Sequence, residues 1–272
     1  MPEHKKRVLL AGESWTSAAT HIKGFDQFAT VSFHLGAEPL VAALADSPFA
    51  LTYMKAHEAA AEFPLSLEAL AAYDAVILSD LGANTLLLHP DVWFRGEPVP
   101  NRLKLLREWV AGGGGLMMIG GYYSFQGING GARYHRTPVE EVLPVDCLPY
   151  DDRIEVPEGF RAELVRPDHP ILAGLDGEWP VLLGCNEVRL KAGPGIELLA
   201  RLPANQGGHP LLATGTHGIG RTLAWTSDIG PHWLPQRFAD WPGYVRLWRQ
   251  ALSWLTSSER VGTAGRRGQG RA

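Results

Sequence analysis

The sequence predicts an α/β protein whose central sheet is mainly parallel. Three short apolar runs, at residues 8–11, 75–79 and 116–119, are bounded by glycine or polar residues and have the length of buried strands. Segments with helical character separate these runs along the chain. Strands that alternate with helices in this way form parallel sheets with right-handed crossovers.

The elements of the N-terminal half follow in the order strand, helix, strand, helix, strand, helix, strand. Asn101 is expected to cap the third helix, and the glycines at 112–115 to end it. The predicted elements are a strand at 8–11, a helix at 38–45, a strand at 49–53, a helical turn at 66–71, a strand at 75–79, a helix at 102–111 and a strand at 116–119.

Residues 17–36 show no regular pattern and are expected to form a long irregular loop. The segment carries His21, Lys23, Asp26 and His34 among small and apolar residues. A loop of this length inside a compact domain is usually functional or is an arm that contacts a partner.

The C-terminal half has a different character. A short helix is expected from Pro138, with Thr137 as its cap and glutamates in its first turn. An amphipathic helix is expected at 243–256. Between them, β-like runs separated by proline and glycine predict an antiparallel extension of the sheet. These runs are at 161–166, 187–190, 196–201, 210–214 and 221–226.

The composition is that of an ordinary globular protein, with 272 residues, 45% apolar and 20% charged. We expect one domain over residues 1–256 and a disordered, glycine-rich basic tail over 257–272. A net charge of −4 argues against nucleic acid or an anionic membrane as a partner. With no run as long as a membrane span and no signal-peptide pattern, a cytoplasmic location is expected.

Neither a metal nor an organic cofactor is predicted. The two cysteines, Cys147 and Cys185, match no zinc motif, and no His-x-His or His-Glu-x-x-His spacing occurs. The glycines at 112–115 lack the Lys-Ser or Lys-Thr of a phosphate-binding loop, and no Gly-x-Gly-x-x-Gly follows the first strand. Spacing leaves open whether the histidines converge in space.

Four polar motifs follow predicted strands, and together they resemble the glutamine amidotransferase-like family. They read Gly-Glu-Ser-Trp at 12–15, Ser-Asp-Leu-Gly-Ala-Asn-Thr-Leu-Leu at 79–87, Gly-Gly-Tyr-Tyr-Ser-Phe-Gln-Gly at 120–127 and Thr-Ser-Asp-Ile-Gly-Pro-His-Trp at 226–233. The family belongs to the class I glutamine amidotransferase-like superfamily, near the trehalose-utilisation-type proteins. The resemblance covers about residues 7–256 and implies a flavodoxin-like sheet with helices on both faces.

The resemblance also implies a nucleophile elbow, Gly-x-Cys-x-Gly, directly after a central strand. Here the elbow reads Gly-Gly-Tyr-Tyr-Ser at 120–124, so Tyr122 stands in the cysteine position. The late histidine of the superfamily corresponds to His232, but no glutamate follows it. We therefore expect no glutaminase activity.

Side chains that follow parallel strands meet at the carboxyl edge of the sheet, where ligands bind in open α/β folds. We expect Glu13, Asn84, Tyr122, Ser124 and His232 to border one cleft there. The further candidates for substrate binding are Ser14, Trp15, Asp80, Tyr123, Gln126, Asp228 and Trp233.

Acid–base chemistry would fall to His232, Glu13 and the hydroxyls of Tyr122 and Ser124. Asp228 precedes His232 by four residues and could hold its imidazole in one tautomer, although spacing does not decide whether the two meet. Each candidate also has a structural interpretation: the aromatic residues could simply pack, and Glu13 could cap a helix or form a surface ion pair.

Two functions remain open on this basis. The first is an enzyme that acts by acid–base chemistry on a small polar metabolite, of carbohydrate origin if the kinship to trehalose-utilisation-type proteins extends to the substrate. The second is a non-catalytic protein that binds a small molecule. A homodimer or higher homo-oligomer is expected, because residues 17–36 and a tryptophan-rich C-terminal segment offer apolar surface.

Overall fold

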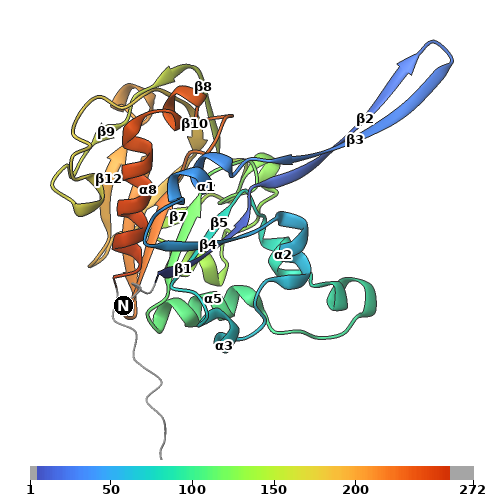
Figure 1. The fold of residues 1–272 in the computed structure, drawn as a ribbon, viewed down its shortest axis with the longest axis horizontal. Coiled ribbons are helices and arrows are strands. Elements are labelled where there is room, and N and C mark those ends of the chain that lie inside the picture. The colour runs from blue at the N-terminus through green and yellow to red at the C-terminus, as the bar shows by residue number, and fades with distance from the viewer. Residues whose placement is uncertain (1–4, 258–272) are drawn as a thin grey trace, which may run out of the picture.

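In the computed structural model, which describes residues 5–257, an eight-stranded sheet forms the centre of the molecule (Figure 1). Its spatial order is β4-β1-β5-β6-β14-β13-β12-β9. The strands are β1 (Lys6–Gly12), β4 (Phe49–Met54), β5 (Ala75–Ser79), β6 (Gly115–Ile119), β9 (Glu163–Leu164), β12 (Glu197–Arg201), β13 (Pro210–His217) and β14 (Gly220–Trp225).

The first five strands in this order are all parallel. Counted along the chain, they follow the order 2-1-3-4-5, which is the flavodoxin-like order. The three apolar runs read from the sequence are β1, β5 and β6, and they are neighbours, which confirms the predicted parallel sheet. All residues of β5 and β6 are buried, as expected for strands covered on both faces.

The antiparallel extension is confirmed, but it begins one strand later than predicted. Residues 221–226 were expected within it. They largely form β14, which pairs in parallel with β6 on one side and antiparallel with β13 on the other. The run at 187–190 lies outside the central sheet, in a small pair formed by β7 (Val145–Cys147) and β11 (Val188–Leu190). A second pair, β8 (Arg153–Phe160) with β10 (Leu182–Asn186), was missed because charged residues and glycines interrupt its apolar pattern.

Helices cover both faces of the sheet. One face packs against α1 and α8, and the other against α2, α4, α5 and α6. As predicted, Asn101 caps α5 and Thr137 caps α6; α2 was not foreseen. The helices are α1 (Glu38–Leu44), α2 (Ala56–Glu62), α3 (Leu67–Leu70), α4 (Ala83–Leu87), α5 (Arg102–Ala111), α6 (Pro138–Val142), α7 (Gln236–Ala239) and α8 (Pro242–Leu255). Within residues 5–257, no helix has the length and apolarity that crossing a membrane requires.

Residues 17–36 do not form the irregular loop expected from the sequence. They belong to a regular hairpin of two ten-residue strands, β2 (Ser14–Lys23) and β3 (Asp26–Leu35). Figure 1 shows this hairpin, hereafter the arm, projecting far from the body of the molecule. Residues 29–35 of β3 do alternate apolar and polar side chains, a strand signal that the sequence-based prediction overlooked, whereas β2 shows no such alternation.

The basic tail was predicted to begin at residue 257, and residues 258–272 lie outside the part of the chain that the structure describes.

Candidate functional site

A cavity of about 400 Å³ lies at the carboxyl ends of β1, β5, β6 and β14. Strand order reverses between β1 and β5, and this is the switch point at which open α/β folds bind ligands. The residues that line the cavity come from the segments following those four strands and from the base of the arm. They are Glu13, Trp15, Gly36, Asp80, Tyr122, Tyr123, Asp228, Gly230, Pro231 and His232.

Two of the lining carboxylates, Glu13 and Asp80, directly follow β1 and β5 and have left-handed backbone conformations, with φ of 48° and 46°. Non-glycine residues adopt such angles only where their surroundings fix them. For Glu13 the fixing contacts are hydrogen bonds: its N–H donates to the Ser79 carbonyl at 2.8 Å, and its carbonyl accepts from the Tyr53 hydroxyl at 2.6 Å. Two carboxylates of one cavity thus both have strained backbone conformations.

The Glu13 side chain is buried, and its Oε2 accepts a hydrogen bond from the Ser79 hydroxyl at 2.5 Å. Burial raises its pKa well above the ordinary value, and the negative charges of Asp80 and Asp228 raise it further. The bond from Ser79 opposes this shift but is the smaller effect. Glu13 therefore holds its proton to a higher pH than an exposed glutamate does.

Asp80 connects the segments that follow β5 and β6. Its Oδ1 accepts from the Tyr123 N–H at 2.6 Å, and its own N–H donates to the Ser124 hydroxyl oxygen at 3.0 Å. Burial raises the pKa of its carboxyl to about 6, against the opposing effect of the bond from Tyr123. Asp80 therefore changes charge near the lower end of the physiological pH range.

His232 and Asp228 do meet, although their spacing alone could not show it. The imidazole Nδ1 lies 2.9 Å from Asp228 Oδ2, which also accepts from the Trp233 N–H at 2.8 Å. The hydrogen bond to Asp228 raises the pKa of His232, and burial only partly opposes it. Because Nδ1 is used by the carboxylate, Nε2 is the ring nitrogen that remains for a ligand.

Aromatic rings hold the imidazole in place. Tyr122 meets the His232 ring edge-on at 4.6 Å between centroids, and Trp233 stacks on it at 5.2 Å. Glu155 joins these two aromatic residues, since it accepts from the Tyr122 hydroxyl at 3.2 Å and from the Trp233 indole N–H at 2.9 Å. Arg153 lies over the Tyr122 ring at 5.1 Å.

Sequence reasoning missed Arg153 and Glu155, which both belong to β8. Their positions depend on the pairing of β8 with β10, two strands that the composition did not reveal. The only signal available was the change of character after Pro144.

A polar network orders the chain that follows the Tyr122–Gln126 turn. Asp152 accepts from the N–H groups of Gln126 and Gly127 at 2.8 and 2.9 Å, and from the Asn186 side chain at 2.8 Å. Gln126 therefore lies in this network, where its side chain bonds the Gly130 carbonyl and the His135 N–H, and it does not line the cavity.

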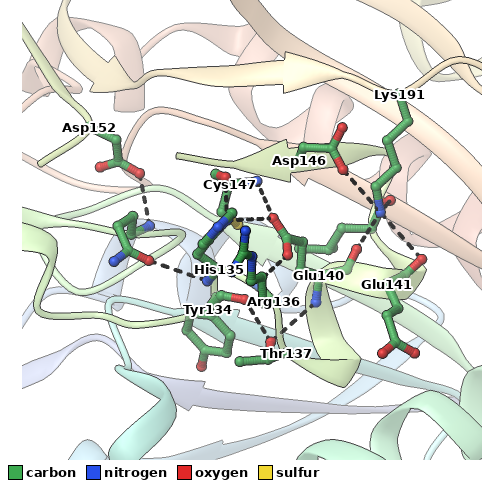
Figure 2. Close-up of polar contacts among 12 residues, drawn as sticks. Tyr134, His135, Arg136, Thr137, Glu140, Glu141, Asp146, Cys147, Asp152 and Lys191 are labelled. Carbon is green, nitrogen blue, oxygen red and sulfur yellow. Dashed lines mark hydrogen bonds and ion pairs between the residues drawn. The ribbon is translucent and has the colours of Figure 1, made fainter. Parts of the chain in front are cut away.

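Figure 2 shows the same network continuing into α6 and β7. Glu140 Oε1 accepts from the Cys147 N–H at 2.7 Å, and His135 Nδ1 lies 2.8 Å from the Cys147 carbonyl oxygen. Lys191 donates to carbonyl oxygens at the end of α6, including that of Leu143 at 2.9 Å. These contacts fix the segment that follows the turn carrying Tyr122 and Tyr123.

Three of the five residues expected to border one cleft do so: Glu13, Tyr122 and His232 line the cavity, whereas Asn84 and Ser124 do not. Asn84 is exposed in α4, because the chain turns into a helix directly after Gly82. Ser124 is buried against the N–H of Asp80.

The remaining predicted binding residues divide in the same way. Trp15, Asp80, Tyr123 and Asp228 line the cavity. Ser14 is buried and its hydroxyl accepts from the Ala56 N–H at 2.9 Å, at the start of α2. Trp233 lies behind His232 and contacts it from the protein side.

The turn after β6 differs from a nucleophile elbow in geometry as well as in sequence. Positive φ angles occur at Gly121 and Phe125, and Tyr122 between them does not have one. Both cysteines are buried, in β7 and β10, outside the residues that line the cavity. Burial raises the pKa of both thiols, which disfavours the nucleophilic thiolate. In the described part of the chain, no group of three or more His, Cys, Asp or Glu side chains has the arrangement of a metal site.

The fold and the cavity define a flavodoxin-like α/β protein with a carboxylate–histidine pocket at its switch point. The family described as "Putative glutamine amidotransferase" matches residues 7–257, so the chain belongs to this glutamine amidotransferase-like family. A comparison with the curated proteins finds no match.

Two solved structures from Salmonella typhimurium are similar over nearly the whole chain. The cytoplasmic protein STM3548 is 39% identical, with a TM-score of 0.86 over 91% of this chain and 98% of that one. The cytoplasmic protein STM1381 is 40% identical, with a TM-score of 0.86 over 92% and 99%. A ThuA-like protein of Parabacteroides merdae shares the fold at 13% identity, with a TM-score of 0.50 over 96% and 94%.

Proposed function

We propose that this protein is an enzyme that acts by acid–base chemistry on a small polar metabolite, and that it does not hydrolyse glutamine. The observation that carries the proposal is the convergence of Glu13, Asp80 and the Asp228–His232 pair on one cavity. Placing three carboxylates together in a partly buried site opposes folding, because each disfavours ionisation of the others. Such arrangements are typical of catalytic sites.

The two groups best suited to move protons have complementary states. Glu13, whose pKa is raised well above its ordinary value by burial, serves as the acid that donates to a substrate oxygen or nitrogen. His232 presents Nε2 to the cavity and accepts a proton from the substrate when it is neutral, while Asp228 stabilises the resulting imidazolium. Pairs of groups whose surroundings separate their protonation states are the usual basis of acid–base assignments.

The chemistry of the cavity favours a neutral polyhydroxylated or cationic substrate over an anionic one. Its charged side chains are carboxylates and one histidine, and the side chains of Trp15, Tyr122 and Tyr123 supply aromatic surface. Carboxyl groups bind hydroxyls or amines by hydrogen bonds, and aromatic faces pack on the C–H surfaces of sugar rings. A carbohydrate-derived metabolite fits both features.

Glutamine hydrolysis is disfavoured because the site lacks an activated thiol. Tyr122 in the cysteine position has its hydroxyl bonded to Glu155, and its pKa is raised by burial, so the phenol is not a nucleophile near neutral pH. Ser124 is buried outside the cavity lining. A cytoplasmic location is supported by the names of the two Salmonella relatives.

The proposal is tested by a thermal-shift screen with neutral sugars and polyols, sugar acids, amines and amino acids, followed by NMR detection of substrate turnover and of solvent deuterium incorporated at carbon. A ligand present at about 100 times its dissociation constant adds roughly 2.7 kcal/mol of stability. We expect wild type to bind and convert one of the neutral or cationic compounds.

Two variants and a matched control make the test specific. Glu13→Gln and His232→Asn are expected to lose turnover by about 100-fold or more, as is usual when a general acid or base is removed. Glu158→Gln, at an exposed position of β8 outside the cavity lining, is expected to keep it. Binding without turnover in wild type would favour the alternative, a non-catalytic small-molecule-binding protein. Ammonia release from glutamine would contradict the proposal outright.

A further inference from the structure

The arm formed by β2 and β3 is the least explained part of the structure. Its two strands pair only with each other within residues 5–257, so both outer edges of the ribbon are open. An isolated two-stranded ribbon is marginally stable in water, and open edges pair readily with other strands. Residues 14–35 contain none of the usual protective prolines, and their only charged residues, Lys23 and Asp26, are at the tip. A ribbon of this kind is more stable when another surface covers it.

One face of the arm repeats itself about its midpoint. Trp15 stacks on His34 near the base, with 5.1 Å between ring centroids, and His21 stacks on Phe28 near the tip at 4.7 Å. Between these stacks lie only the small pairs Ser17–Ser32 and Ala19–Thr30. The midpoint falls at the pair Ala18–Val31, which is equidistant from both stacks.

The opposite face is apolar along most of its length. Val31 is 70% exposed, and Ile22 and Phe33 on the same face are exposed as well. A soluble chain rarely leaves a continuous apolar surface of this kind open to water. Because the arm also carries no net charge, its partner has no need of a complementary charge.

The tip of the arm carries an exposed aromatic side chain, and a hollow that could receive such a side chain lies at the base of the arm. Phe25, in the turn between the strands, is fully exposed. The hollow, of about 640 Å³, lies between the base of the arm, α1 and the start of α8. Its lining includes Trp15, Pro39 and Val245, and it shares Trp15 with the candidate active site.

We propose that the arm binds the arm of a second copy of this chain, with the two ribbons antiparallel across a two-fold axis near Ala18 and Val31. The apolar faces meet in that arrangement, so Val31 lies at the axis, and the two stacks, which side-chain alternation places on the opposite face, remain on the outside. Each tip then lies at the base of the other arm, which places the partner's Phe25 at the hollow. The second copy thereby completes one side of each active site at Trp15.

The arms supply part of the surface that a stable dimer requires. Ten residues at about 3.3 Å each give a ribbon about 33 Å long, and two strands with their side chains are about 10 Å wide. One face of each arm therefore contributes roughly 330 Å², less than half of the roughly 800 Å² per partner of a standard interface, and the contact of each tip with the hollow of the other copy supplies the remainder. A two-fold arrangement is also the commonest way in which one patch binds itself.

The first experiment is the mass of the full chain in solution, measured by light scattering and sedimentation at micromolar concentration. We expect a species of twice 29.7 kDa. Val31→Arg places two like charges at the axis and is expected to weaken the dimer by at least about 100-fold. Phe25→Ser is expected to weaken it by about 10-fold, since a buried aromatic anchor is lost. Glu68→Arg, on the exposed side of α3, is the matched control and should change nothing.

The second experiment locates the axis by cross-linking with a short bismaleimide. Both native cysteines are buried, so a cysteine introduced on the arm is the reactive one. We expect Ala18→Cys to give a covalent dimer and Glu68→Cys to give none. A monomer in wild type overturns the proposal, and so does a dimer that Val31→Arg leaves intact and Ala18→Cys does not cross-link. Neither result depends on the chemistry proposed for the cavity.

Discussion

Two groups of buried charge in this protein have opposite surroundings. Arg102 in α5 is fully buried, and its guanidinium donates to four main-chain carbonyl oxygens at the ends of α2 and α4. Glu13 and Asp228 are buried and Asp80 is half-buried, three acidic groups around one open cavity. The Arg102 guanidinium is surrounded by hydrogen-bond acceptors, whereas the acidic residues at the cavity lie beside groups of the same charge.

The difference separates a structural role from a functional one. Carbonyl oxygens attract a cation, so Arg102 joins two helix ends and contributes to stability although burial lowers its pKa to about 10. The acidic group raises the pKa of its own members and leaves hydrogen-bonding capacity facing the cavity. Groups that oppose folding and border a cavity are retained for what they do to a ligand.

The largest expected effect is at the structural site. Arg102→Met leaves four main-chain carbonyl groups without their donor, and we expect a loss of about 3 kcal/mol or more in the free energy of unfolding. Arg107→Met on the same helix removes a surface ion pair with Glu141 and should cost less than about 1 kcal/mol. Urea unfolding of both variants measures the difference, and equal losses would show that the carbonyl contacts are unimportant.

The next effect has the opposite sign. Asp80→Asn keeps an oxygen for the Tyr123 N–H and removes a charge from the acidic group, so we expect unfolding to require about 1 to 3 kcal/mol more at pH 7.5. The pKa of Asp80 is raised from 3.8 to about 6 on folding. Wild type therefore loses stability as the pH rises from about 4 to about 6, and the variant does not.

Unfolding of wild type and Asp80→Asn at several pH values tests this sign. Two curves that converge below pH 4 and separate above pH 6 agree with the account. A variant that is less stable than wild type at pH 7.5 would mean that Asp80 is a structural group like Arg102.

The smallest effect concerns His232. Its bond to Asp228 is the largest cause of its raised pKa, so Asp228→Asn should lower that pKa in an NMR titration. A raised histidine pKa contributes stability that is present below pH 6.5 and is lost as the pH rises through the folded value. Because half the imidazole is exposed, the accompanying change in unfolding free energy should stay below about 1 kcal/mol. An unchanged titration would mean that Asp228 does not set the protonation of His232.

The parallel part of the fold could be predicted because its strands are buried on both faces and read as continuous apolar runs, as 116–119 does. The arm and the β8–β10 pair could not be predicted in the same way. β2 has no regular apolar pattern, and β8 mixes charged and apolar residues, so neither strand could be recognised by periodicity. The alternation at 29–35 in β3 was a strand signal that the prediction overlooked.

The candidate site, like the fold, could be predicted from the sequence in part. Glu13, Asp80, Tyr122 and His232 follow strands of one sheet edge, so the rule about carboxyl ends brings them together. Asn84, Ser124 and Gln126 follow the same strands but turn away into a helix, a buried contact and a polar network. The direction of a side chain within a turn depends on contacts far along the chain, and the sequence does not display these.

The protonation state of Glu13 tests the central claim most directly, since the proposed chemistry requires a carboxylic acid in the cavity. Selective ¹³C labelling of glutamate carboxyl groups, with Glu13→Gln to assign the signal, follows this one group through a pH titration. We predict a neutral Glu13 carboxyl at pH 7, held by burial and by the charges of Asp80 and Asp228. A Glu13 that ionises at or below its ordinary value of 4.5 would contradict the account.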